Sequence, residues 1–160
     1  MPRAAGKTRK DYTLILFVEV WVKDIFRLGR QFPWSRPPRC PGCGGRIWGH
    51  GFCRAYFDGF DQALWLRRYR CRDCGMVFRL RPRGYWSRFQ APVGVIRFSL
   101  ELRLATGRWL IDLSRSRQGH WLRGLIRRVL AYLGNQWKGR WLEGFDYLWA
   151  MGKNPVCRSI

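Results

Sequence analysis

Residues 40–44 read CPGCG and residues 71–75 read CRDCG, so the chain contains two matching Cys-x-x-Cys turns, each followed by a glycine. A turn of this kind presents two thiolates to one ion, and zinc binds four such ligands in a tetrahedral arrangement. The glycine after the second cysteine permits the backbone to reverse its direction. We therefore expect one structural zinc ion, with no coordination position open for catalysis, held by Cys40, Cys43, Cys71 and Cys74.

The segment between the two turns, residues 44–70, is longer than the roughly 15 to 20 residues of the commonest zinc pattern. A longer hairpin is therefore required, and the sequence predicts a turn at residues 58–61 and strands over residues 46–50, 52–57, 63–70 and 76–80. A redox motif or a pair of disulfides is the alternative, but such motifs seldom occur as two matched turns. Outside the turns, Cys53 and Cys157 are expected to be buried or free thiols, and His50 to serve in packing or in a phosphate contact.

The segment before the first turn has an ambiguous pattern. Apolar residues alternate from Tyr12 to Val22 as in a strand, yet their spacing also fits a helix. Because β-branched and aromatic residues are concentrated early in this segment, we predict a strand over residues 13–20. A short helix that ends near Gly29 is expected to follow it.

The segment 81–84, with the sequence RPRG, indicates a linker, after which apolar residues recur at helical spacing. We predict a helix from Pro92 to Gly107, a shorter one that contains Trp109, Leu110 and Leu113, a turn over residues 114–119, and a helix over residues 120–133. This order is that of a helix-turn-helix, although any three-helix bundle has the same apolar stripe.

The expected fold class is α+β, with an N-terminal strand and short helix, a four-cysteine zinc ribbon, and a small helix-turn-helix-like module. The expected domains are a flexible basic arm (residues 1–11), the strand, helix and ribbon (12–84), the helical module (85–135) and an aromatic-rich C-terminal segment (136–160).

The charge of the chain indicates its class of partner. Of 160 residues, 31 are lysine or arginine and 10 are acidic, which gives a net charge of +21. Such an excess repels itself unless a polyanion supplies counter-charge, so nucleic acid is the first candidate. Most of the basic residues are arginines, which form bidentate contacts with phosphates and with guanine edges.

Arginines and aromatic residues alternate around the second turn, a pattern typical of a ribbon that lies along a phosphate backbone. The alternative is a solvated face over core aromatics. On the last predicted helix, residues at the N-terminal end are those that reach base edges. The candidate contacts are Arg67, Arg68, Arg70, Arg72, Arg79, Arg81 and Arg83 on the ribbon, and Arg117, Gln118, His120, Arg123 and Arg127 on the helical module.

Several stretches carry a resemblance to a known group, namely residues 39–44 (RCPGCG), 48–51 (WGHG), 68–75 (RYRCRDCG) and Phe78, followed by the predicted helices up to Leu133. They resemble bacterial mobile-element proteins in which a zinc ribbon precedes a helix-turn-helix, including the N-terminal regions of some insertion-sequence transposases. The specific part of this resemblance is the cysteine frame. It implies a module that recognises element ends or operator-like DNA, while a separate domain carries the catalytic carboxylates.

We do not expect that catalytic domain here. The ten acidic residues are scattered along the chain, whereas a two-metal active site needs converging carboxylates. No Ser-His-Asp set, phosphate loop or His-Glu-x-x-His motif is apparent in the sequence. We therefore expect a non-enzymatic accessory factor or regulator of transposition, or a truncated transposase.

The sequence thus predicts a zinc-dependent protein that binds double-stranded DNA. An RNA-binding or ribonucleoprotein component is the second hypothesis, and a protein-interaction adaptor that contacts a transposase or another protein through residues 136–160 is the third. No apolar stretch approaches the ~20 residues that span a bilayer, and Glu19 and Lys23 interrupt the apolar run that could suggest a signal peptide. No membrane partner is expected, and the predicted location is the cytoplasm.

Overall fold

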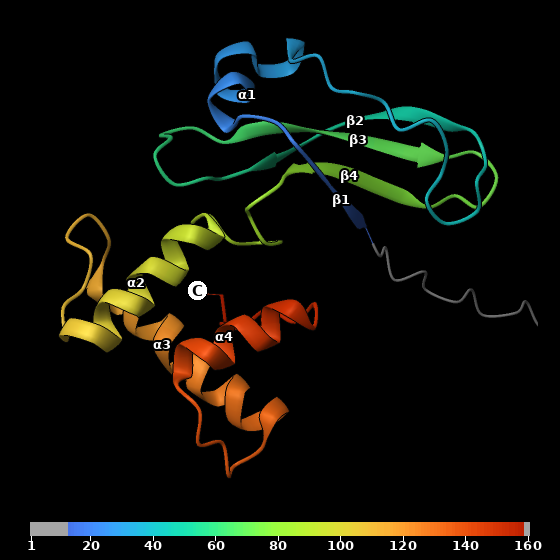
Figure 1. Ribbon diagram of the computed structural model, residues 1–160. Helices are drawn as coiled ribbons and strands as arrows, with labels where there is room; N and C mark the ends of the chain where they lie inside the picture. Colours follow the sequence, from blue (N-terminus) through green and yellow to red (C-terminus); the bar gives the residue numbers. More distant parts are fainter. Residues whose placement is uncertain (1–12, 159–160) are drawn as a thin grey trace, which may run out of the picture. The chain divides into compact units, whose positions relative to one another are not determined.

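The computed structural model describes residues 13–158, so the predicted basic arm lies outside the described residues. The described chain contains a four-stranded sheet and four α-helices, which confirms the predicted α+β class. The chain divides between Arg83 and Gly84 into two compact units, here called the sheet unit and the helical unit. Figure 1 shows the elements of each.

The sheet unit has the strand order β1-β4-β3-β2, formed by β1 (Leu14–Val18), β2 (Ile47–Ala55), β3 (Leu64–Cys71) and β4 (Val77–Pro82). β1 runs parallel to β4, whereas the other neighbours are antiparallel. Helix α1 (Val22–Leu28) follows β1, continues into a short 3-10 turn (Gly29–Gln31) and packs against β3. The predicted N-terminal strand and short helix are therefore confirmed.

A β-bulge shapes the long hairpin between β2 and β3. Gly49 pairs with Tyr69 and Phe52 pairs with Arg67, so two residues of β2 lie opposite one residue of β3. One of those two is Gly51, whose φ of 68° is in the left-handed region that glycine adopts readily. The prediction of separate strands over residues 46–50 and 52–57 is therefore wrong, because the bulge accommodates the extra residue inside one continuous strand.

The core of the sheet unit adjoins the cysteine turns. Ile47, Phe78 and Leu80 are buried together with Cys40 and Cys71. The rings of Tyr69 and Phe78 stack across β3 and β4 with their centroids 5.8 Å apart. The cysteine turns are thus held by the same apolar cluster that holds the sheet.

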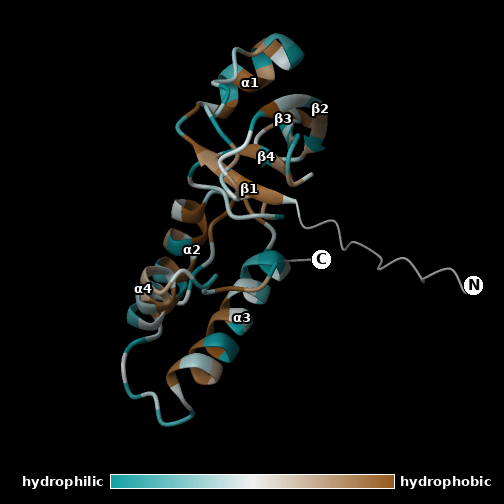
Figure 2. Cartoon of the chain, turned by 90° about the vertical axis from the view of Figure 1, so that its right-hand side faces the viewer, coloured by the Kyte–Doolittle hydropathy of each residue, from teal (hydrophilic) through white to brown (hydrophobic). Residues whose placement is uncertain are grey.

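The helical unit consists of α2 (Val93–Thr106), α3 (Arg115–Leu133) and α4 (Trp141–Ala150). Hydrophobic and hydrophilic residues recur along α3 at turn spacing (Figure 2), as in an amphipathic helix. Residues from all three helices and from the C-terminal segment form one buried core, which includes Ile96, Leu100, Trp121, Leu125, Val129, Phe145, Leu148 and Val156. Arg97 of α2 joins Asp146 of α4 in a bidentate ion pair with N–O distances of 2.9 and 2.8 Å, and this pair lowers the pKa of the Asp146 carboxyl.

Two helix predictions are wrong. Residues 107–114 form an irregular loop instead of a short helix, and α3 begins at Arg115 instead of near residue 120. The earlier start of α3 is explained by an N-cap within the polar residues 114–119: the Ser114 hydroxyl accepts the backbone N–H of Arg117 at 3.2 Å. The short middle helix of a helix-turn-helix is therefore missing from the described residues between α2 and α3.

Glycines allow close approach within the helical unit, which leads to a first prediction. A Cβ added at Gly144 of α4 would lie 2.6 Å from a methyl group of Val129, a fully buried residue of α3. We expect Gly144→Ala to destabilise the helical unit by about 1–3 kcal/mol, because this clash outweighs the higher helix propensity of alanine. Urea unfolding of the full chain, followed by tryptophan fluorescence, measures the change.

The matched control is Gly94→Ala. Gly94 lies in α2, and an added Cβ there would meet nothing within 4 Å. This substitution is expected to leave the helical unit unchanged or to stabilise it by up to about 1 kcal/mol. Equal stabilisation by both substitutions would contradict the close approach of α4 to α3.

Candidate metal centre and basic surface

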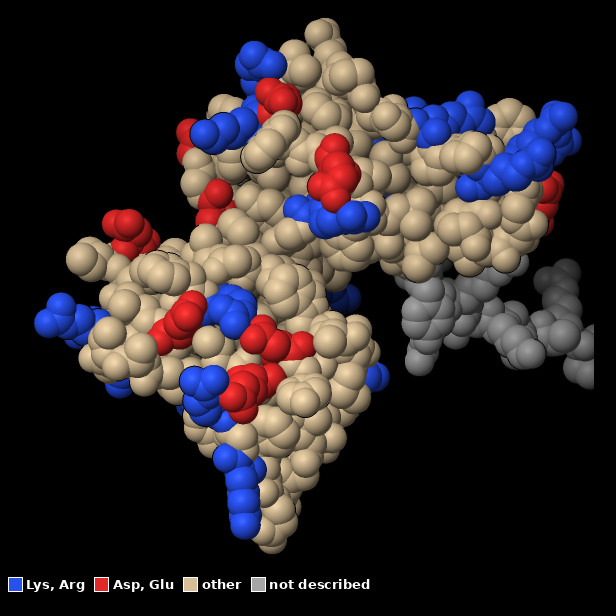
Figure 3. Space-filling view, viewed as in Figure 1, with Lys and Arg blue, Asp and Glu red and all other residues tan. Residues whose placement is uncertain are grey.

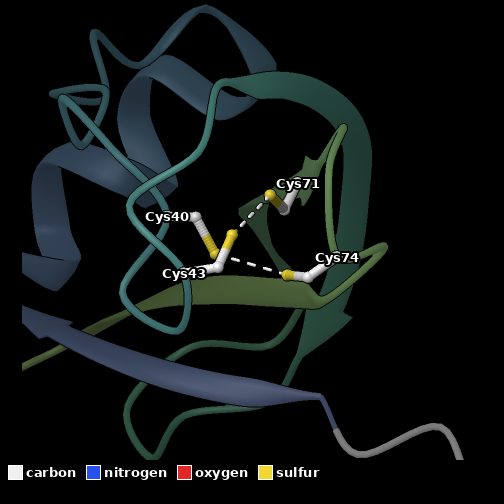
Figure 4. Close-up of side chains that lie close together, drawn as sticks. All are labelled: Cys40, Cys43, Cys71 and Cys74. Carbon is white, nitrogen blue, oxygen red and sulfur yellow. Dashed lines mark hydrogen bonds between the residues drawn. The ribbon is translucent and has the colours of Figure 1, made fainter.

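The structure brings together the four cysteines of the two turns (Figure 4). Their sulfur atoms all lie within 4.8 Å of one another. The Sγ atoms of Cys40 and Cys74 are 3.8 Å apart, and those of Cys43 and Cys71 are 3.5 Å apart. Four thiols in this arrangement could hold one metal ion.

The sulfur spacing fits a tetrahedral thiolate site. With a metal–sulfur bond of about 2.3 Å, the sulfurs at the corners of a tetrahedron are about 3.8 Å apart. A disulfide requires a sulfur–sulfur bond of about 2.05 Å. The measured distances match the first geometry, and all six cysteines of the chain are free thiols.

The two turns share one type of backbone hydrogen bond and the conformation of the glycine that follows them. The N–H of Cys40 donates to the carbonyl of Gly45 at 2.9 Å, and the N–H of Cys71 donates to the carbonyl of Met76 at 2.8 Å, each spanning five residues. The glycines that follow the second cysteines, Gly44 and Gly75, have φ values of 73° and 72°. The expectation that these glycines reverse the backbone is therefore confirmed.

The sheet positions the two turns beside each other. The first turn leads directly into β2, while the second connects the end of β3 to the start of β4. The backbone N–H of Arg72 donates to the carbonyl of Arg46 at 2.9 Å, which joins the two segments. The side chain of Arg39 donates to the carbonyl of Gly44 at 3.2 Å and supports the first turn.

The thiols differ in acidity before a metal binds. The backbone N–H of Cys74 donates to the Cys71 sulfur and, with other donors around it, lowers the pKa of Cys71 to about 7. At Cys43 the N–H of Gly45 acts in the same direction, but the neighbouring thiols of Cys71 and Cys74 outweigh it and raise the pKa to about 12. A metal must displace protons from such thiols, so its affinity falls as the pH falls.

Three of the candidate arginines lie on one face of the sheet. Arg68 of β3 and Arg79 of β4 are paired across the strands, and Arg70 lies two residues beyond Arg68 on the same face. The Nε atoms of Arg68 and Arg79 are buried without a hydrogen-bond partner. Like charges directly opposite each other destabilise a sheet, so this pair favours an anion as a further partner.

The remaining ribbon candidates occupy different environments. Arg67 lies over the ring of Phe52 at 4.8 Å, and Arg72 is exposed. Arg83 forms an exposed ion pair with Glu19 at 2.7 Å. Arg81 is only 2% exposed and lies over the ring of Phe57, so the prediction that it contacts nucleic acid is wrong.

The candidate residues on α3 also differ in burial and in contacts. Gln118 is fully buried: it accepts the Ser99 hydroxyl at 2.6 Å and the N–H of Leu110 at 3.0 Å, and it donates to the carbonyls of Leu110 and Leu113. Its predicted contact with a base is wrong, because its polar atoms are used inside the unit.

The other four α3 candidates lie closer to the surface. The Nε2 atom of His120 lies 2.6 Å from the carbonyl of Arg158, so this ring contacts the C-terminal segment. Arg117 is half-buried with its guanidinium over the ring of Trp121, whereas Arg123 and Arg127 are exposed. These last two place their charges on the outer face of α3.

Acidic residues pair with arginines elsewhere. Asp24 and Arg27 pair within α1, Glu143 pairs with Arg140 at the start of α4, and Arg97 pairs with both Glu101 and Asp146. Figure 3 shows acidic and basic side chains next to each other on one face of the helical unit. The arginines of the sheet strands and of α3 lie on elements that contain no acidic residue.

No helix in the described part of the chain is long and apolar enough to cross a membrane. Comparisons of the chain with protein-family models, with curated proteins and with solved structures found no match.

Proposed function

We propose that this chain is a non-catalytic, zinc-dependent nucleic-acid-binding protein, with double-stranded DNA as its ligand. The observation that carries the proposal is the distribution of charge over the elements. Every Lys, Arg, Asp or Glu residue in β2, β3, β4 and α3 is an arginine. A sheet and a helix with this charge attract a polyanion, and phosphate contacts supply most of the affinity of such a complex.

The sheet unit serves in this proposal as a zinc ribbon. The tetrahedral sulfur spacing and the two equivalent turns support a four-thiolate zinc site, which leaves no open coordination position. Zinc then stabilises the hairpins that carry Arg68, Arg70 and Arg79, and these residues bind phosphates.

Helix α3 is proposed to lie in the major groove. An α-helix fits the width of that groove, and Arg123 and Arg127 are exposed four residues apart on one face of α3. The short middle helix of the expected helix-turn-helix is missing from the described residues. In its place the loop 107–114 connects α2 to α3, and α3 serves as the helix that enters the groove. Its biological setting is transposition, as an accessory factor or regulator, and this rests on the resemblance of the cysteine frame.

A second function, adaptor binding, has one specific observation in its favour. Three residues at the end of α4, Tyr147, Trp149 and Met151, are 60%, 47% and 55% exposed. Aromatic residues and methionine are enriched in protein interfaces. A transposase or another protein is the partner that this surface would bind.

The test of DNA binding is the double substitution Arg123→Gln, Arg127→Gln. We expect it to weaken binding to duplex DNA and to reduce the slope of log affinity against log salt by about 2, because about one counterion is released per phosphate contact. Fluorescence anisotropy with a labelled duplex, repeated over a salt series, measures both quantities for the zinc-loaded full chain.

The matched control is Arg27→Gln, Arg140→Gln, which removes the same charge from arginines that already pair with Asp24 and Glu143. This control is expected to change the slope by well under 1. Equal losses of affinity in both double variants would show that the effect comes from net charge alone and not from these positions on α3. Tighter, sequence-dependent binding of structured RNA would replace DNA by RNA as the ligand.

A further inference from the structure

A cavity of about 590 Å³ lies at the start of α3, where the loop 107–114 joins it to α2. Arg103 from α2, Arg108 from the loop and Arg115 from α3 all line it, together with Trp109 and Ile111. Among the described residues that line this cavity none is acidic, and the one acidic residue of the loop, Asp112, is not part of the lining. The cavity is therefore a concentrated positive site with an apolar wall.

The loop is held in a defined conformation from both sides. On the inner side, the buried amide of Gln118 bonds to the backbone N–H and carbonyl of Leu110 and to the carbonyl of Leu113. At the start of the loop, Arg103 donates to the carbonyl of Gly107, and its guanidinium lies 4.7 Å from the ring centroid of Trp109. A site whose backbone is fixed in this way loses little conformational entropy when a ligand binds.

The tip of this loop presents an apolar side chain to solvent. Ile111 is 97% exposed, so it contributes almost nothing to the packing of the helical unit. Arg108 is also exposed three residues before it. Apolar side chains next to arginines are used by nucleic-acid-binding proteins to contact or separate bases.

We propose that this cavity binds a phosphodiester group of a nucleic-acid strand and that Ile111 contacts the sugar or base beside that phosphate. The inference rests on the proposed nucleic-acid-binding function and assigns it a specific site. Arg108 and Arg115 form charge-assisted hydrogen bonds with the phosphate oxygens, and Arg103 supports them from the ring of Trp109. The positive end of the α3 dipole, which is adjacent to Arg115, adds to the attraction.

The experiment compares two variants of the zinc-loaded full chain. One variant carries both Arg108→Gln and Arg115→Gln, and the other carries Ile111→Ser alone. Binding to a labelled duplex and to a labelled single strand of the same sequence is measured by anisotropy over a salt series. The double variant should bind at least about tenfold more weakly, with a salt slope reduced by about 2. Ile111→Ser should weaken binding without changing the slope, because an apolar contact releases no counterion.

The controls separate failure of this site from failure of the general function. Arg27→Gln, Arg140→Gln removes equal charge from ion pairs outside the loop and should bind like the wild type. Wild-type affinity in both loop variants would overturn this inference and leave the nucleic-acid-binding function intact, whereas the absence of any binding by the wild type would overturn both.

Two competitors identify the source of the anion. Inorganic phosphate at millimolar concentration should compete only weakly, because it lacks the sugar and base that Ile111 contacts. Vesicles of phosphatidylserine and phosphatidylcholine should compete with the nucleic acid for the wild-type protein no better than for the Ile111→Ser variant. Vesicle binding that exceeds nucleic-acid binding and depends on Ile111 would overturn the inference in favour of a lipid surface.

Discussion

Cys71→Ser is expected to abolish binding of the proposed zinc ion and to unfold the sheet unit. Cys71 is buried beside Cys40 in the cluster that contains Ile47, Phe78 and Leu80. A structural zinc contributes an apparent ~10–16 kcal/mol to folding in small zinc modules, which matches or exceeds the total stability of a typical domain. A hydroxyl is a poor ligand for zinc, so the remaining three thiolates should not compensate for the loss.

The helical unit is expected to remain folded in this variant. Its core is formed by residues of α2, α3, α4 and the C-terminal segment. Amide hydrogen exchange should therefore lose protection in β2, β3 and β4 while the helices keep theirs. The same pattern is expected when a strong chelator removes the metal from the wild type.

Cys53→Ser is the matched control. The Cys53 sulfur lies 3.8 Å from the carbonyl of Leu66 and belongs to neither turn. This variant should keep one equivalent of zinc, measured by elemental analysis of the purified chain, and a protected sheet. A Cys71→Ser variant that keeps both would show that the cluster does not stabilise the fold through a metal.

Gln118→Ala is expected to destabilise the helical unit by about 3–5 kcal/mol. The substitution leaves the Ser99 hydroxyl and backbone groups of Leu110 and Leu113 without their partner. Each buried polar group that loses its hydrogen bond costs about 1–3 kcal/mol, and such losses belong to the largest effects of single substitutions. Urea unfolding of the full chain measures the loss.

A second glutamine supplies the comparison for this effect. Gln136 lies in the exposed loop between α3 and α4, and Gln136→Ala is expected to change stability by less than about 0.5 kcal/mol. A Gln118→Ala variant that kept its stability and lost only DNA binding would contradict the buried hydrogen-bond network. It would support the predicted contact of Gln118 with a base.

The position of Gln118 could have been recognised from the sequence. It lies three residues before Trp121 and seven before Leu125, so it continues the apolar stripe of α3 toward the N-terminus. A polar residue on that stripe indicates a buried hydrogen-bond network. The partners of that network come from α2 and the loop, and the helical spacing contains no information on them.

The sequence by itself determined the parts of this protein that depend on local chemistry. Two Cys-x-x-Cys turns followed by glycine predicted both the four-cysteine cluster and the positive φ angles of Gly44 and Gly75, because each reversal is completed within a few residues. The β-branched and aromatic composition likewise predicted β1 and the short helix α1 after it, where the apolar period was ambiguous, and the apolar period predicted α2. In each case the signal and its consequence lie within one element.

Only the tertiary structure decided the features that depend on distant partners. The bulge at Gly51 appears because β2 must match the register of β3. Arg81 is buried with its guanidinium over the ring of Phe57, a residue that follows the end of β2. The loop 107–114 replaces a short helix because Gln118, from the next helix, satisfies its backbone groups. Which arginines remain exposed is therefore a property of packing, since neighbouring positions in the sequence carry the same charge but reach different surroundings.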